Sequence, residues 1–100
     1  MRYDKLVRDR IPELIVSRGE ACSFHVASDE EYRTKLYEKL REETEELVVD
    51  RNVDEVADIL EVLDAIRALE GMSEAEVDRA RREKLEQRGG FSKRLILEES

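Results

Sequence analysis

The longest amphipathic pattern lies in the first half of the chain. Apolar residues there recur at spacings of four and seven, as they do along one face of a helix. They are Tyr32, Leu36, Leu40 and Leu47. Ser28 and Glu31 form a capping box just before this pattern, because a serine side chain can bond the backbone three residues on. The pattern predicts a helix from Asp29 to about Val49.

A second helix is predicted after a short break. Asn52 is a good N-cap, and Gly71 suits the left-handed turn that ends many helices. Between them the chain is apolar on nearly every side, which is typical of an internal helix in a bundle. The apolar residues are Val56, Ala57, Ile59, Leu60, Val62, Leu63, Ile66 and Leu69. Because the connection is short, the two helices are expected to pack antiparallel.

Weaker patterns predict two more helices near the ends of the chain. Pro12–Arg18 is expected to be a short helix, because proline suits the first helical turn. Ser73 and Glu76 form another capping box and open a charged helix that ends at Gly89. We thus expect four helices in all.

Composition agrees with an all-α helical bundle. The 100 residues are 44% charged and 40% hydrophobic, which suits charged helices around a narrow apolar seam. Segments 21–27 and 91–97 are interpreted as extended and as a possible two-stranded ribbon beside the bundle. We expect one domain, residues 1–100, and a homodimer or homotetramer, because so short a chain buries only a modest core.

Charge and cysteine content narrow the class of protein. A net charge of −8 opposes binding to nucleic acid or to an anionic membrane, because both require a positive field. No apolar run reaches the roughly 20 residues that a spanning helix needs. The single cysteine, Cys22, cannot form an intramolecular disulfide, and no signal peptide is evident. These features favour a cytoplasmic protein.

Acidic residues gather between Glu38 and Glu61, where the chain has ten acidic and three basic residues. On a helical wheel, Glu43 falls inside the apolar stripe and Glu46 falls on its edge, whereas Glu45 points outward. An unpaired carboxylate in an apolar stripe is costly. The wheel therefore separates an inward acidic pair from the solvated residues around it.

The next helix carries a matching pair. Glu55 and Asp58 fall among apolar positions and, like Glu43 and Glu46, are spaced i, i+3 on one helical face. Four carboxylates at a shared seam would repel one another, and a hard cation such as Mg²⁺, which prefers oxygen ligands, would relieve that repulsion. The alternative is a structural network in which these acids pair with lysine or arginine from another helix.

These spacings resemble a known family. Glu43-Thr44-Glu45-Glu46 and Glu55-Val56-Ala57-Asp58 are similar to the ExxE and ExxD motifs of the all-α nucleoside triphosphate pyrophosphohydrolases, the MazG-like superfamily. The surrounding KLREETEEL and DEVADILEVLDAI also look like its two metal-binding helices. Within it, KLVRD at Lys5–Asp9 and RGGF at Arg88–Phe91 resemble a small group of house-cleaning enzymes. The likeness covers almost the whole chain.

The resemblance implies an activity and a ligand set. Glu43, Glu46, Glu55 and Asp58 would bind Mg²⁺, with Mn²⁺ as a substitute. The reaction would cut a nucleotide between its α and β phosphates, releasing a monophosphate and pyrophosphate. Glu46, at the edge of the stripe, is our preferred general base. Lys5, Arg8, Lys84, Arg88 and Arg94 are the candidate substrate-binding cations, although surface cations also serve solubility alone.

Two other functions fit the same sequence. One is a phosphoribosyl-ATP pyrophosphohydrolase of histidine synthesis, a branch of the same superfamily, although the KLVRD and RGGF segments point away from it. The other is a non-catalytic module whose acidic helices form a surface for self-association or for a partner. The sequence does not specify the base or sugar of a substrate.

Overall fold

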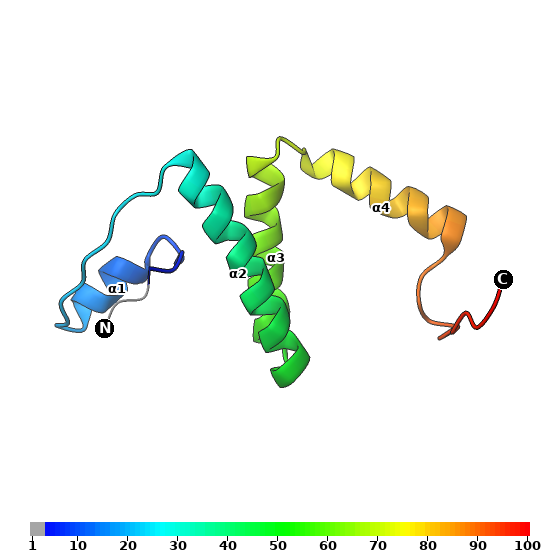
Figure 1. Ribbon diagram of the computed structural model, residues 1–100, viewed down its shortest axis with the longest axis horizontal. Helices are drawn as coiled ribbons and strands as arrows, with labels where there is room; N and C mark the ends of the chain where they lie inside the picture. The colour runs from blue at the N-terminus through cyan, green and yellow to red at the C-terminus, as the bar shows by residue number, and fades with distance from the viewer. Residues whose placement is uncertain (1–3) are drawn as a thin grey trace.

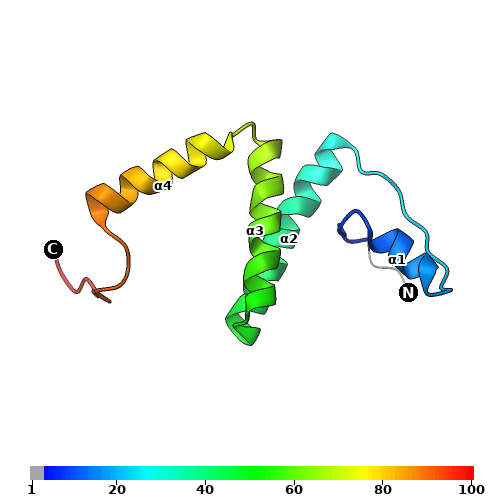
Figure 2. The same cartoon turned by 180° about the vertical axis from the view of Figure 1, so that it is seen from behind.

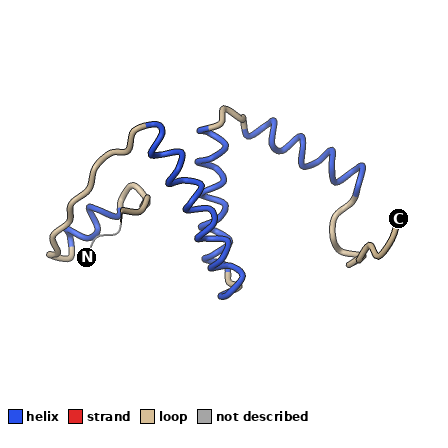
Figure 3. Tube along the Cα trace, viewed as in Figure 1, coloured by secondary structure: helices blue, strands red, loops and turns tan. Residues whose placement is uncertain are grey.

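The computed structural model describes residues 4–100 and is all-α, as predicted (Figure 1). The four helices are α1 (Ile11–Ser17), α2 (Asp29–Asp50), α3 (Val53–Leu69) and α4 (Glu74–Arg88). Within that range the remaining residues form turns and loops, and no strand is present (Figure 3). None of these helices is long and apolar enough to cross a bilayer.

Three of the helices begin at the capping residues that the sequence predicted. In each, the side chain of the capping residue accepts a hydrogen bond from the backbone N–H three residues later, which satisfies a group that the helix leaves free. The pairs are Ser28 with Glu31 at 3.2 Å, Asn52 with Glu55 at 3.0 Å and Ser73 with Glu76 at 3.0 Å. Local sequence therefore sets where α2, α3 and α4 begin.

The core lies between α2 and α3, which form an antiparallel hairpin (Figure 1). Leu36 from α2 is 2% exposed and packs with Val62 and Ile66 from α3. Arg51 makes the turn between the helices in a left-handed conformation, with φ of 51°. Five partly buried side chains extend this core: Leu6, Tyr32, Leu40, Ala65 and Leu69.

Residues 4–10, here called the N-terminal strap, run beside this hairpin. Leu6 packs against the core. Two cations of the strap form ion pairs with α2 and α3. Lys5 Nζ lies 3.4 Å from Glu42 Oε1 on α2, and Arg8 Nη2 lies 2.8 Å from Asp58 Oδ1 on α3. The strap thus ties the start of the chain to both helices of the hairpin.

The C-terminal part of the chain, here called the arm (α4 and the tail to Ser100), projects away from the hairpin (Figure 2). Every residue from Gly71 to Ser100 is exposed. The expected ribbon between segments 21–27 and 91–97 is wrong for the described chain, because these segments lie at opposite ends of the molecule (Figure 1). The first leads from α1 into α2, whereas the second continues the projecting arm.

Candidate metal centre

Three acidic side chains meet across the α2–α3 hairpin. Glu43 comes from α2, and Glu55 and Asp58 come from α3, one turn apart. One carboxylate oxygen from each lies within 4.8 Å of the others. These three residues, here called the acidic cluster, are three of the four positions that the helical wheel placed toward the shared seam.

Burial makes the acidic cluster costly without a positive partner. Glu43 is only 5% exposed, and its Oε2 has no hydrogen-bond partner. The Oε2 of Glu55 is also buried without a partner. Desolvation raises the pKa of Glu43, the neighbouring Glu46 carboxyl raises it further, and Lys39 partly offsets the rise. The cluster therefore holds buried oxygens that could accept a cation.

Glu46 stands apart from the other three predicted ligands. It is partly buried on α2, one turn beyond Glu43, but is not among the three residues whose oxygens converge. Its position next to Glu43 leaves its carboxylate at the edge of the cluster.

Two cations already touch the acidic cluster. Lys39 Nζ lies 3.4 Å from Glu43 Oε1, and Arg8 from the N-terminal strap pairs with Asp58. Sequence reasoning had proposed Arg8 but had overlooked Lys39, although its i, i+4 spacing from Glu43 was a usable signal. These pairs are the kind of contact that the structural-network alternative requires, but they leave Glu55 Oε2 and Glu43 Oε2 without partners.

The other predicted substrate-binding residues are divided between two regions. Lys5 lies on the N-terminal strap and pairs with Glu42, one residue before Glu43. Lys84, Arg88 and Arg94 all lie on the arm and are exposed. In a single chain, the N-terminal cations are therefore next to the acidic cluster and the C-terminal cations are not.

The chemistry of the donor set fits a hard divalent cation. All of the converging ligands are carboxylate oxygens, which Mg²⁺ and Mn²⁺ prefer over nitrogen or sulfur ligands. Two helices hold them, and the α2–α3 core below fixes the spacing between those helices. With only three converging carboxylates, such an ion would keep open positions for water or for phosphate oxygens.

Comparisons with known proteins provide no evidence about this centre. No protein family, no curated protein and no solved structure matches the chain. The likeness to MazG-like enzymes therefore rests on the short motifs in the sequence. The distances and burial in the acidic cluster are independent of that likeness.

Proposed function

We propose that the protein is a Mg²⁺-dependent nucleotide pyrophosphohydrolase. Its substrate is a nucleoside triphosphate or a related nucleotide, cut between the α and β phosphates into a monophosphate and pyrophosphate. A house-cleaning role, the removal of unwanted nucleotides, is the physiological form of this activity that the KLVRD and RGGF motifs favour.

One observation supports the metal requirement most strongly. Two buried carboxylate oxygens, from Glu43 and Glu55, lack partners, and an oxygen of Asp58 lies within reach of both residues. Burying carboxylate oxygens without a hydrogen-bond partner is costly, and a divalent cation would offset that cost. When bound, the cation would neutralise phosphate charge and lower the pKa of a coordinated water.

The chain's own residues divide the remaining tasks. Glu46, at the edge of the acidic cluster, takes the proton from the attacking water as general base. Arg8 and Lys5 lie on the N-terminal strap beside the cluster, where they pair with Asp58 and Glu42. These two cations would contact the phosphates of a bound nucleotide. Arg8 suits this role because its planar guanidinium binds two phosphate oxygens at once. The charge of the leaving pyrophosphate is thus met by cations from one short segment.

The test is a screen for pyrophosphate release with Mg²⁺ or Mn²⁺ and a panel of nucleoside triphosphates that includes phosphoribosyl-ATP. We expect turnover that Glu43→Gln and Asp58→Asn each reduce by about 100-fold or more, because each removes a charged ligand. Glu45→Gln is the matched control: Glu45 is exposed on α2 between the ligand positions, so this variant should retain activity.

Other outcomes of the screen would favour the two alternative functions. High preference for phosphoribosyl-ATP would assign the protein to histidine synthesis. Absence of turnover, together with no thermal shift on adding either metal, would contradict the hydrolase and leave a structural acidic module. The ion pairs of Lys39 and Arg8 with the acidic cluster give that module its physical basis.

A further inference from the structure

The chain exposes far more surface than a compact chain of its size. Its accessible surface is 9362 Å², whereas a compact monomer of this mass exposes about 5900 Å². Its radius of gyration is 17.9 Å, against about 13 Å for a compact chain of this length. A standard interface buries about 800 Å² per partner. The excess surface is several times the area that each partner buries in a standard interface.

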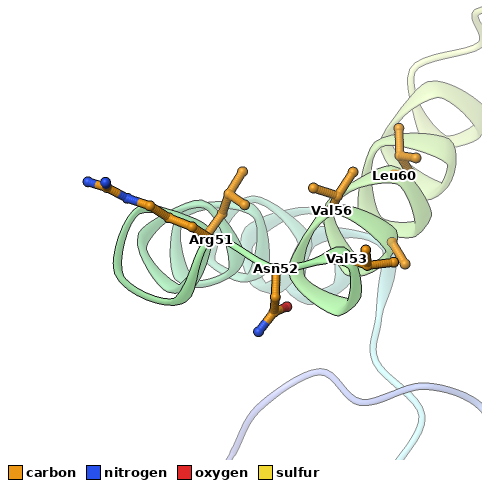
Figure 4. A pocket seen from close by; sticks show the side chains of 7 residues that line it. Arg51, Asn52, Val53, Val56 and Leu60 are labelled. Carbon is orange, nitrogen blue, oxygen red and sulfur yellow. The ribbon is translucent and has the colours of Figure 1, made fainter.

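Part of this excess is an apolar row on α3 that α2 leaves exposed. Val53, Val56, Leu60 and Leu63 follow one another at spacings of three, four and three, as in the seam of a coiled coil. All four are exposed, Leu60 by 61%. Val53, Val56 and Leu60 (Figure 4) line a shallow hollow at the turn of the hairpin, with a volume of about 500 Å³. We call this row the α3 seam.

An acidic row runs beside the α3 seam. Asp54, Glu61 and Asp64 each follow a seam residue by one position, so they lie along the same side of α3. All three are exposed, and they are separate from the acidic cluster, which faces α2. Asp64 already pairs with Arg67 of the same helix, so Asp54 and Glu61 are the main acidic contacts for a partner. A partner for this surface should therefore present an apolar row bordered by positive charge.

The arm offers positive charge beside two exposed apolar residues, Val77 and Leu85. From Arg79 to Arg94 it has seven basic residues and two acidic ones. Arg81, Lys84 and Arg88 follow Val77 by four, seven and eleven residues, which puts all of them on one face of α4. Leu85 borders this face and is 58% exposed. The two acidic residues, Glu83 and Glu86, lie toward the other side of the helix.

The turn between α3 and α4 holds the arm away from the α3 seam of its own chain. Arg67 Nη1 donates to the Met72 carbonyl at 2.6 Å, and Arg67 Nη2 bonds Asp64 at 2.9 Å and lies 3.6 Å from Glu74. The Met72 N–H in turn donates to the Arg67 carbonyl at 2.9 Å. Folding α4 back onto its own α3 would break these contacts, whereas docking on a second copy would keep them.

We propose that the arm of each chain docks on the α3 seam of a second copy, in a reciprocal two-fold dimer. Val77 and Leu85 cover the apolar row, while Arg81 and Lys84 lie against the acidic row of the partner. A reciprocal exchange satisfies both surfaces in a closed assembly. In this arrangement the basic residues of the arm contact the second copy. The proposal does not depend on the proposed hydrolase activity.

Sedimentation equilibrium of the full chain tests the dimer. We expect twice the 11.7 kDa protomer mass for the unaltered protein. Leu60→Lys should weaken association because it puts a charge in the apolar row, and Lys84→Glu should weaken it by about tenfold or more because it creates like-charge contacts. Glu61→Lys combined with Lys84→Glu should restore association, because the two residues then have opposite charges again, with their signs reversed.

Two controls separate these effects from general damage. Arg79→Glu makes the same charge change on the opposite side of α4, two residues after Val77, and should leave association unchanged. Val16→Lys on α1 starts from a residue as exposed as Leu60, at 61%, and should also have no effect. Circular dichroism of each variant should match the unaltered helical content, because all of these residues are exposed.

Zero-length carboxyl–amine cross-linking of mixed ¹⁴N and ¹⁵N protein distinguishes exchange from folding back within one chain. Arm exchange should give products of mixed isotope that join Lys84 to Asp54 or Glu61. Products of a single isotope would overturn it in favour of an arm folded on its own chain. A monomer at all concentrations, or a dimer sensitive to Leu60→Lys but not to Lys84→Glu, would also overturn it.

Discussion

The α2–α3 hairpin and the arm are both helical, yet only the hairpin has a core. Leu36, Val62 and Ile66 are buried in the hairpin, whereas no residue of the arm is buried. Both α3 and α4 have a side-chain N-cap. A cap therefore defines where a helix starts, but burial of an apolar face determines whether the helix is fixed in the fold.

The two regions also use charge differently. In the hairpin, Glu43 lies in the apolar stripe and is buried with one oxygen unpaired. In the arm, the charged residues are all exposed to water. Charge that remains in water costs little, whereas buried charge requires a partner. The hairpin is consequently the region where buried charge indicates a candidate binding site, whereas the exposed charge of the arm carries no comparable cost.

The largest contrast between the regions should come from truncating one leucine in each. Leu36→Ala in the hairpin should lower the free energy of unfolding by about 2–5 kcal/mol at every protein concentration, because it leaves a cavity in the core. Leu85→Ala in the arm should act only through the second copy, so its effect should depend on concentration. Denaturant unfolding at several concentrations measures both. Equal, concentration-independent losses would remove the distinction.

A smaller contrast should appear when the N-caps of α3 and α4 are removed. Asn52→Ala should lower global stability by about 1 kcal/mol, because α3 folds together with the core. Ser73→Ala removes the same bond from α4 and should speed amide hydrogen exchange in α4 alone. Exchange followed residue by residue distinguishes the two. If Ser73→Ala slowed or accelerated exchange across α2 and α3, the arm would belong to the hairpin's cooperative unit.

The smallest effect concerns the buried charge. The pKa of Glu43 is raised above its ordinary value of 4.5, so the folded chain binds a proton more readily than the unfolded chain. The associated stability is present below pH 4.5 and is lost as the pH rises through the raised pKa. Glu43→Gln mimics the protonated form, so without metal it should raise the free energy of unfolding at pH 7.

Thermal unfolding between pH 4 and pH 8 in chelator measures this effect. The gain from Glu43→Gln should shrink as the pH falls toward 4, and Glu86→Gln in the arm, where the side chain is exposed, should give no gain at any pH. Added Mg²⁺ should stabilise the unaltered protein and the Glu86→Gln variant more than the Glu43→Gln variant. A loss of stability for Glu43→Gln at pH 7 would mean that its pair with Lys39 outweighs its desolvation.

Much of the local structure could be predicted from residues close together in the sequence. Ser28, Asn52 and Ser73 indicated the helix starts because capping depends on side chains only three residues from their partners. The wheel placed Glu43 in the apolar stripe for a similar reason, since helical geometry fixes the directions of neighbours. The ribbon prediction failed because pairing of segments 21–27 and 91–97 depends on how distant parts of the chain are placed.

Local sequence was enough to predict four helices, the caps of three of them and the inward direction of Glu43, because each depends on contacts within a few turns. Only the tertiary structure decided that Glu43, Glu55 and Asp58 converge while Glu46 stays at the edge, and that Arg8 reaches Asp58 across fifty residues. The tertiary structure also decided that α3 keeps an uncovered apolar row and that the arm stands clear of it. Such relations depend on which faces pack together, and local spacing does not encode that choice.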